Sequence, residues 1–315
     1  MPLARCACAA FLAALMATLA PAAGAADLSP DGASATLVVA YTLVGKGDEI
    51  PASRERHVTW SVDDGFEVRA TLKAQKASGH PSLHKAGAAD QARQQQRMDA
   101  AQAAVASQAD LMAAAQKAAE KCGDNQACLM AEVQKMTKMV DPAKTKAAQE
   151  QMAIATAQPA ARYQIFSGTT QQASFRINEH ATEAYFDAAC SLKNEASCRI
   201  DTTVKGSGAT TDGNGKTTTQ TGAFAEIDAQ AGTLVLMLPT PLLASADQVV
   251  QSASGQRQSG QSKVTRSVHT DHVKEAVRVS CGDCKSASGK YTREIKDTVV
   301  GRPATLTVSW TFTRP

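Results

Sequence analysis

Residues 58–72 read VTWSVDDGFEVRATL, and the alternation in this stretch sets the class of the fold. Apolar side chains occupy every second position on both sides of Asp63-Asp64-Gly65, which is the pattern of half-buried β-strands. An aspartate-glycine pair between two such runs is a typical signal of a tight turn. The sequence therefore predicts a β-hairpin over residues 56–74.

Further strands are predicted on both sides of this hairpin. Residues 36–44 are almost wholly apolar and predict a more deeply buried strand, whereas residues 304–313 alternate most regularly. Leu234 to Leu238 is apolar on both faces, which favours a central strand. The other expected strands cover residues 163–167, 172–178, 182–187, 198–205, 220–228, 262–280 and 290–299.

The composition changes between residues 86 and 157, where Ala, Gln, Lys and Met dominate and predict helices. Each helix has one narrow apolar stripe, and we expect the stripes to face each other. The stripes are Met98, Val105, Met112 and Ala119 in the first helix, and Leu129, Val133, Met136 and Val140 in the second.

Signals that end and begin helices divide this block. Gly123 can end the first helix and Asp124 can cap the second, so a Cys122–Cys128 disulfide would clamp a helical hairpin. Asp141-Pro142 ends the second helix and can start a third, weaker one that runs to about residue 157.

These patterns together predict an α+β protein. We expect a mainly antiparallel β-sheet or sandwich with an inserted, disulfide-clamped α-helical hairpin. In this division, residues 1–26 are a signal peptide, 27–85 and 158–315 form the sheet domain, and 86–157 form the insertion.

The first 26 residues have the organisation of a cleavable secretory signal. Arg5 supplies a positive charge, residues 9–20 form an apolar core too short to span a bilayer, and small residues follow at 24–26. We expect cleavage before Asp27, with Ala25 as an equally suitable last residue of the signal. No later stretch has the roughly 18 apolar residues of a membrane helix, so the sequence predicts a periplasmic or secreted protein with no membrane span.

Charge and cysteine content narrow the function classes. Without Arg5 the chain has 32 of its 33 basic residues against 30 acidic ones, interspersed along the sequence, which does not favour nucleic acid as a partner. Six cysteines follow the signal in three close pairs, and an even number in an exported chain indicates disulfides. Pairing between sequence neighbours would join Cys122 to Cys128, Cys190 to Cys198 and Cys281 to Cys284.

The strongest local candidate for chemistry is Cys281-Gly282-Asp283-Cys284, a spacing found in redox dithiols and in zinc sites. A redox dithiol needs a following helix to lower a thiol pKa, and this segment instead leads into a predicted strand. A disulfide that closes a turn is therefore the favoured interpretation. In the alternative, His269 and His272 join Cys281 and Cys284 in a metal site.

Motifs of the common hydrolases and nucleotide-binding proteins are incomplete in this chain. Gly215-Lys216-Thr217 lacks the upstream glycine of a phosphate loop, because Thr210 stands at its place. Ser82-Leu83-His84-Lys85 has the spacing of penicillin-recognising enzymes without their partner motifs. No catalytic residue and no cofactor is predicted.

The sequence therefore favours a non-catalytic exported envelope protein with a binding or structural role. The partner would be another envelope protein that contacts the helical hairpin, because methionine side chains make adaptable apolar contacts. The competing hypothesis is a periplasmic thiol-disulfide or metal-handling protein that uses the Cys281/Cys284 loop.

Overall fold

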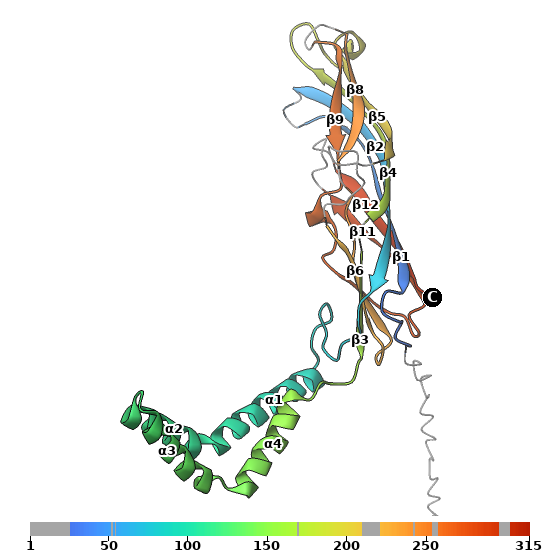
Figure 1. Ribbon diagram of the computed structural model, residues 1–315. Coiled ribbons are helices and arrows are strands. Elements are labelled where there is room, and N and C mark those ends of the chain that lie inside the picture. Colours follow the sequence, from blue (N-terminus) through green and yellow to red (C-terminus); the bar gives the residue numbers. More distant parts are fainter. Residues whose placement is uncertain are drawn as a thin grey trace, which may run out of the picture.

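The computed structural model describes residues 26–51, 53, 55–168, 170–209, 221–241, 243–253, 258–295 and 303–315 (Figure 1). The helices are α1 (Ala88–Ser107), α2 (Ala109–Cys122), α3 (Gln126–Met139) and α4 (Pro142–Thr156), with short 3-10 turns η1 (Glu195–Ser197) and η2 (Thr270–His272). The strands are β1 (Ser34–Glu49), β2 (Arg56–Ala74), β3 (Tyr163–Gly168), β4 (Thr170–Tyr185), β5 (Ile200–Ala209), β6 (Ala223–Asp228), β7 (Thr233–Met237), β8 (Ala244–Ser252), β9 (Gly260–Arg266), β10 (Val277–Ser280), β11 (Ser286–Ile295) and β12 (Ala304–Thr313).

The protein is α+β and its sheet is antiparallel, as the alternation predicts. The described strands are hydrogen-bonded into one sheet, in the order β10-β7-β6-β3-β2-β4-β5-β8-β9, and β1, β12 and β11 continue from the other edge of β2. β2 is therefore the strand from which the sheet extends in both directions. It pairs with β1 from Val58 to Lys73, and with β4 from Arg56 to Ala70.

The hairpin predicted over residues 56–74 is wrong, because β2 passes straight through Asp63-Asp64-Gly65. Each of the three residues has a partner on β1: Asp63 is opposite Val44, Asp64 opposite Leu43 and Gly65 opposite Thr42. Local turn preference is weak compared with a ladder on each side of the strand, and here the ladders determine the conformation. The predicted strands at 172–178 and 182–187 are likewise one strand, β4.

Two other strand predictions need correction. The segment predicted as one strand over 262–280 contains β9, the 3-10 turn η2 and β10. Residues 296–299 of the predicted strand 290–299 lie outside the described residues.

The core lies on one face of the sheet. From Val62 to Ala74, every even-numbered residue of β2 is buried, and Leu37, Val39 and Tyr41 of β1 lie at partner positions on the same face. Phe166 of β3 meets Phe312 of β12 edge to face, with ring centroids 5.8 Å apart. Burial of this continuous apolar surface is the main favourable term in folding.

Along one edge of β2, the paired strand changes from β4 to β3. The end of β2 pairs with β3 at Lys73 and Ala74, while the rest of β2 pairs with β4. Gly168 ends β3 in close contact with β2, because a Cβ atom at this position would lie 2.0 Å from the carbonyl oxygen of Thr71. Glycine is therefore required where the chain crosses from one ladder to the other.

The helices form an arm, residues 88–156, which projects from one end of the sheet (Figure 1). α1 packs against α4 and α2 against α3, so the insertion is two helix pairs in place of the simple hairpin predicted. The first predicted helix is interrupted at Gln108, and Asn125 rather than Asp124 caps α3. Asp141 caps α4 and Pro142 occupies its first turn, as predicted. Within the described residues, no helix is long and apolar enough to cross a membrane.

Two glycine substitutions distinguish the continuous strand from a hairpin. Gly65→Ala should leave stability unchanged or slightly higher, because nothing lies within 4 Å of the added Cβ and the backbone there is extended. Gly168→Ala should cost about 1–3 kcal/mol, because the ladder must move to admit the methyl group. Urea unfolding of both variants with disulfides intact measures the difference. Strong destabilisation by Gly65→Ala would mean that residues 63–65 form a turn after all.

Candidate functional site

All six predicted cysteines are paired with their sequence neighbours. The disulfides are Cys122–Cys128, Cys190–Cys198 and Cys281–Cys284, with Cα–Cα distances of 5.5, 5.9 and 4.6 Å. Each one closes a local turn, and together they indicate a non-cytoplasmic, oxidising compartment.

The Cys281–Cys284 disulfide closes a tight turn between β10 and β11. Both Gly282 and Cys284 have positive φ, 60° and 55°, and the backbone N–H of Cys281 donates to the carbonyl of Gly232. Cys284 is fully buried in the main core, and Arg314 donates from Nε to its carbonyl oxygen at 3.0 Å. The turn thus holds the end of the chain, and neither sulfur is a free thiol.

His269 and His272 lie together, although not on a strand. His269 is the N-cap residue of the 3-10 turn η2 and His272 is the last residue of this turn, and their ring centroids are 5.6 Å apart. Burial and the neighbouring His269 lower the pKa of His272. Within the described residues, no group of three or more His, Cys, Asp or Glu side chains is arranged to hold a metal ion.

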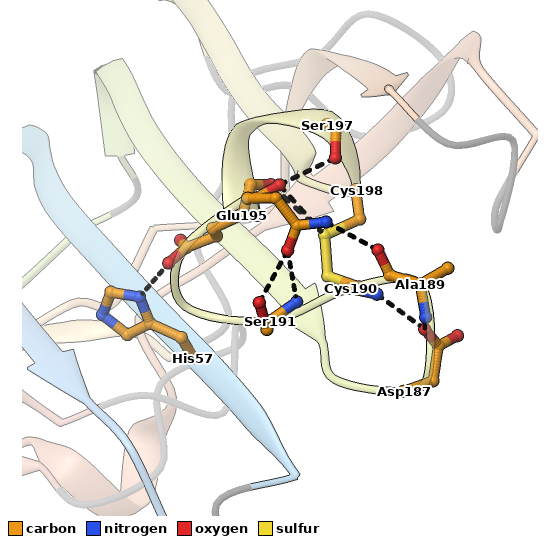
Figure 2. The surroundings of a disulfide bond; sticks show 9 residues. His57, Asp187, Ala189, Cys190, Ser191, Glu195, Ser197 and Cys198 are labelled. Atoms are coloured by element: carbon orange, nitrogen blue, oxygen red, sulfur yellow. Dashed lines mark hydrogen bonds and ion pairs between the residues drawn. A yellow bond between two sulfur atoms is a disulfide. The ribbon is translucent and has the colours of Figure 1, made fainter.

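The Cys190–Cys198 loop is a compact unit that folds around its own side chains (Figure 2). Asp187 accepts hydrogen bonds from the backbone N–H groups of Ala189 and Cys190, and Asn194 accepts from the N–H and hydroxyl of Ser191. These hydrogen bonds and the disulfide fix the conformation within the loop. A separate contact attaches the loop to the sheet.

His57 provides that attachment. Its Nδ1 lies 2.8 Å from Glu195 Oε2 in the loop, and its Nε2 lies 2.7 Å from Asp48 Oδ1 at the end of β1 (Figure 2 shows the bond to Glu195). A neutral imidazole has one N–H, so two carboxylates at hydrogen-bond distance favour the doubly protonated ring. The hydrogen bonds to Glu195 and then Asp48 accordingly raise the pKa of His57.

At the other end of the sheet, a buried carboxylate holds the loop that leads into the arm. Glu226 of β6 has no exposed surface and accepts hydrogen bonds from the backbone N–H groups of Ser82, Leu83 and His84. It also pairs with Nδ1 of His84 at 2.9 Å. Burial would raise the pKa of Glu226, but these hydrogen bonds, led by the one from the His84 side chain, outweigh burial and lower it.

A second polar contact fixes the first turn of the arm. Arg162 forms two hydrogen bonds with Asp228, and its Nη1 lies 3.6 Å from Asp90 of α1. The Tyr163 hydroxyl donates to Asp90 at 3.1 Å. The arm thus leaves the sheet from an anchored base, through groups that are polar and largely shielded from water.

The packing inside the arm differs from the prediction. Alanines form the contact between α1 and α4, where Ala100, Ala104 and Ala148 are buried. Of the expected stripe residues, Met98, Val105 and Met112 are 49%, 55% and 56% exposed and face outward, whereas Leu129 and Met136 of the second stripe are half-buried. The small side chain of alanine lets two helices approach closely, so the larger apolar side chains are left on the outer surface.

A third polar contact, the ion pair between Arg266 and Glu179, spans the inner face of the sheet. Arg266 at the end of β9 donates from Nε and Nη2 to both carboxylate oxygens of Glu179 on β4, at 2.5 and 2.6 Å. β5 and β8 lie between these strands, and a flat sheet would separate them by about 14 Å. The inner face must therefore be concave here.

Asp64 lies beside this ion pair and is 4% exposed. It accepts the backbone N–H of Asn178 at 3.0 Å and shares a hydrogen bond with Glu179. Burial, aided by the charge of Glu179, raises the pKa of Asp64 to about 7. The carboxyl group of Asp64 can therefore keep its proton near neutral pH and donate it to Glu179.

Because residues 63–65 were predicted to form a turn, this site was not predicted from the sequence. Read as one strand, residues 58–72 place Asp64 on the same face as Val62 and Phe66, which marks it as an inward polar residue. Its partners Glu179 and Arg266 could not be found from the sequence, because they come from strands paired over long distances. His57 and Glu226 were also missed for this reason.

Comparison with protein-family models, curated proteins and solved structures gives no match for this chain. The arguments for function therefore come from the contacts and exposed surfaces described above.

Asp64→Asn should change how stability depends on pH. The native pKa of Asp64 is raised above its unfolded value near 4. The stability that Asp64 contributes is therefore fully present below about pH 4 and is lost as the pH rises through about 7. Asparagine keeps both hydrogen bonds without titrating. Relative to the native protein, Asp64→Asn should therefore gain stability between pH 5 and pH 8, at up to about 1.4 kcal/mol per unit.

Urea unfolding with the disulfides intact, at four values between pH 5 and pH 8, measures this change. Asp63→Asn is the matched control, because the hydrogen bond from Arg176 lowers the pKa of Asp63 and its titration falls below this range. Parallel pH profiles for Asp64→Asn and the native protein would contradict the raised pKa of Asp64.

Proposed function

We propose that this chain is an exported, non-catalytic protein of the cell envelope with a binding or structural role. Its helical arm would insert into an apolar groove of a partner protein. The observation that carries the proposal is the outward orientation of the large apolar side chains of the arm.

The exposed apolar residues are concentrated in the arm. Thirteen large apolar residues in the described part of the chain are exposed, and eight of these lie between residues 88 and 156. They are Met98, Val105, Met112, Met130, Val133, Val140, Met152 and Ile154. A surface of this kind on an exported protein is typical of an interaction site, because exposed apolar surface is costly in water.

The charge of the arm favours a protein over a lipid surface or nucleic acid. Residues 88–156 contain eight acidic and eight basic residues, so their net charge is zero. Anionic membranes and nucleic acids attract an excess of Lys and Arg, which the arm lacks. A partner protein with an apolar groove needs no such excess and suits the four exposed, adaptable methionine side chains of the arm.

The base of the arm supports this function. The bonds of Glu226 and Arg162 hold the first turn of α1 and the preceding loop on the sheet, so the arm is presented in a defined direction. Preorganisation of this kind lowers the entropy that binding must overcome.

Export would require removal of the signal peptide, most of which lies outside the described residues. Ala26 is 5% exposed, packs in the main core, and donates its backbone N–H to Ala229 at 2.8 Å. A cut before Asp27 would remove this contact, whereas a cut after Ala25 would keep it. Ala23-Gly24-Ala25 also has the small residues that signal peptidase requires.

The intact mass of protein purified from the periplasm or medium tests this step. We expect a chain that begins at Ala26 and has no alkylatable thiol before reduction. The control is the same chain expressed without residues 1–25 and refolded under oxidising conditions. An uncleaved chain, or free cysteines at 281 and 284, would contradict the proposed compartment.

The arm is tested by replacing three exposed apolar residues with a polar helix former. The variant is Met98→Gln, Val105→Gln and Met112→Gln, and the matched control changes exposed Gln91, Gln102 and Gln149 to Ala. A photoreactive residue at position 130 captures the partner in cells, and one at Lys290 on the sheet serves as the reference position.

We expect one protein to crosslink at position 130 but not at 290. Its purified form should bind the native chain and the control equally, and the triple variant at least about tenfold more weakly, a loss of about 1.4 kcal/mol. Equal binding by the triple variant would overturn the proposal. Crosslinks only to a second copy of this chain would do so as well.

A further inference from the structure

The loop before the arm places a histidine between a buried carboxylate and a threonine hydroxyl. His84 Nδ1 lies 2.9 Å from Glu226 Oε2 of β6, and His84 Nε2 lies 3.1 Å from Thr233 Oγ1 at the start of β7. The imidazole ring also packs against Tyr163, with ring centroids 5.7 Å apart. A hydroxyl, an imidazole and a carboxylate from distant parts of the chain therefore form one continuous chain of hydrogen bonds.

The strand register places these groups on the face of the sheet opposite the main core. On β7, Leu234 and Leu236 belong to that core, so Thr233 and Val235 project from the other face. Glu226 is paired with Val235 and projects from the same face. The loop before α1 covers this face through its backbone N–H bonds to Glu226, which explains why a carboxylate outside the core is buried.

Glu226 fixes the position of the proton on the imidazole. Its carboxylate, whose pKa is lowered despite its burial, can only accept hydrogen bonds. The neutral His84 ring must then carry its proton on Nδ1, which leaves the lone pair of Nε2 to accept the hydroxyl proton of Thr233. A hydroxyl within reach of a base that a third group orients is the arrangement that activates a nucleophile.

A cavity of about 240 Å³ lies beside the threonine hydroxyl, and its lining includes His84, Thr233, Arg278 and Ser280. Ser280 of β10 is paired directly opposite Thr233, and Arg278 lies two residues earlier on the same face of β10. The Arg278 guanidinium donates from Nη2 to the carbonyl of Leu83 and has further N–H groups for a ligand oxygen. The cavity therefore suits a small ligand with an electrophilic carbon at Thr233 and an oxygen toward Arg278.

We propose that Thr233 is an acyl acceptor, which takes a short acyl group from an ester donor. Thr233 Oγ1 attacks the carbonyl carbon of the donor while its proton passes to His84 Nε2, and the N–H groups of Arg278 stabilise the negative carbonyl oxygen. The bond between the carbonyl carbon and the leaving oxygen then breaks, and this oxygen takes the proton from His84. The products are a threonine ester and an alcohol, and Glu226 stays ionised throughout.

This reaction is independent of the proposed function of the arm. It modifies one side chain of the sheet, and Thr233 is not among the exposed apolar residues of the arm. Thr233→Val should therefore bind the partner of the arm like the native chain. A failure of acyl transfer would leave that binding unaffected.

The test uses p-nitrophenyl acetate, an activated short ester, with the full mature chain and its disulfides intact. We expect an acetyl group on Thr233, located by mass spectrometry of the peptides that contain it and followed over time. Lysine side chains and the N-terminus also react with this reagent, so the rate is read at Thr233 itself. Thr307 on the outer face of β12 is the reference hydroxyl and should stay unmodified.

Substitutions of the base and of its positioning residue separate activation from structure. His84→Gln removes the base, keeps the backbone bonds to Glu226, and should slow acetylation of Thr233 at least about a hundredfold. Glu226→Gln can donate to Nδ1 and so move the ring proton to Nε2, which should slow acetylation to a similar extent in a chain that is still folded. Circular dichroism and urea unfolding establish that each variant is folded.

The hydroxyl itself is tested by three further variants. Thr233→Val should lose the acetyl group, and Thr233→Ser, which keeps a hydroxyl, should retain it. Thr307→Val is the matched control and should be acetylated at Thr233 like the native chain. The p-nitrophenol released by the native chain in excess of Thr233→Val should be one equivalent. Release of many equivalents would support acyl transfer to Thr233 and overturn the non-catalytic role proposed above.

Two results would overturn the acyl acceptor. The first is acetylation of lysines and the N-terminus alone in the native chain, which needs no variant to fold. The second is acetylation of Thr233 at the same rate in folded His84→Gln as in the native chain.

Discussion

The double ladder on β2 is the constraint on which the rest of the structure depends. β1 pairs with one edge of this strand, and β4 and β3 pair with the other, so β2 has no free edge along most of its length. Each ladder satisfies backbone donors and acceptors that would be costly to bury unpaired. From Val62 to Ala74 one face of the strand is buried, which fixes the register of its neighbours, since a shift of one residue would turn the whole apolar row toward water.

Buried or half-buried polar side chains then link separate parts of this sheet at three places. Arg266 and Glu179 join across the concave face, Glu226 holds the loop before the arm, and His57 fastens the disulfide loop to the ends of β1 and β2. Each group has several partners, which compensates for its removal from water. Here they join β4 to β9 across the inner face and hold the loop before the arm on the sheet.

The arm and the sheet differ in the kinds of side chain that they expose and bury. The arm is neutral overall, has an alanine contact inside and apolar side chains outside, and is closed at its tip by the Cys122–Cys128 disulfide. The sheet has three buried ionisable groups, Asp64, Glu179 and Arg266, on its inner face, close to a cavity lined by β2, β4, β5 and β8. The exposed apolar side chains of the arm and the cavity among β2, β4, β5 and β8 therefore lie at opposite ends of the molecule (Figure 1).

The sequence alone determined the class of the fold, the helical insertion and the cysteine pairs, because periodicity, composition and short spacing are local properties. Asp141-Pro142 and Gly123 could be read as helix ends for the same reason. It misjudged Asp63-Asp64-Gly65, whose extended conformation depends on strands β1 and β4 on either side. Only the tertiary structure decided that Met98 and Val105 face outward and that Asp64, Glu179 and Arg266 meet, because these outcomes depend on residues that are distant in sequence.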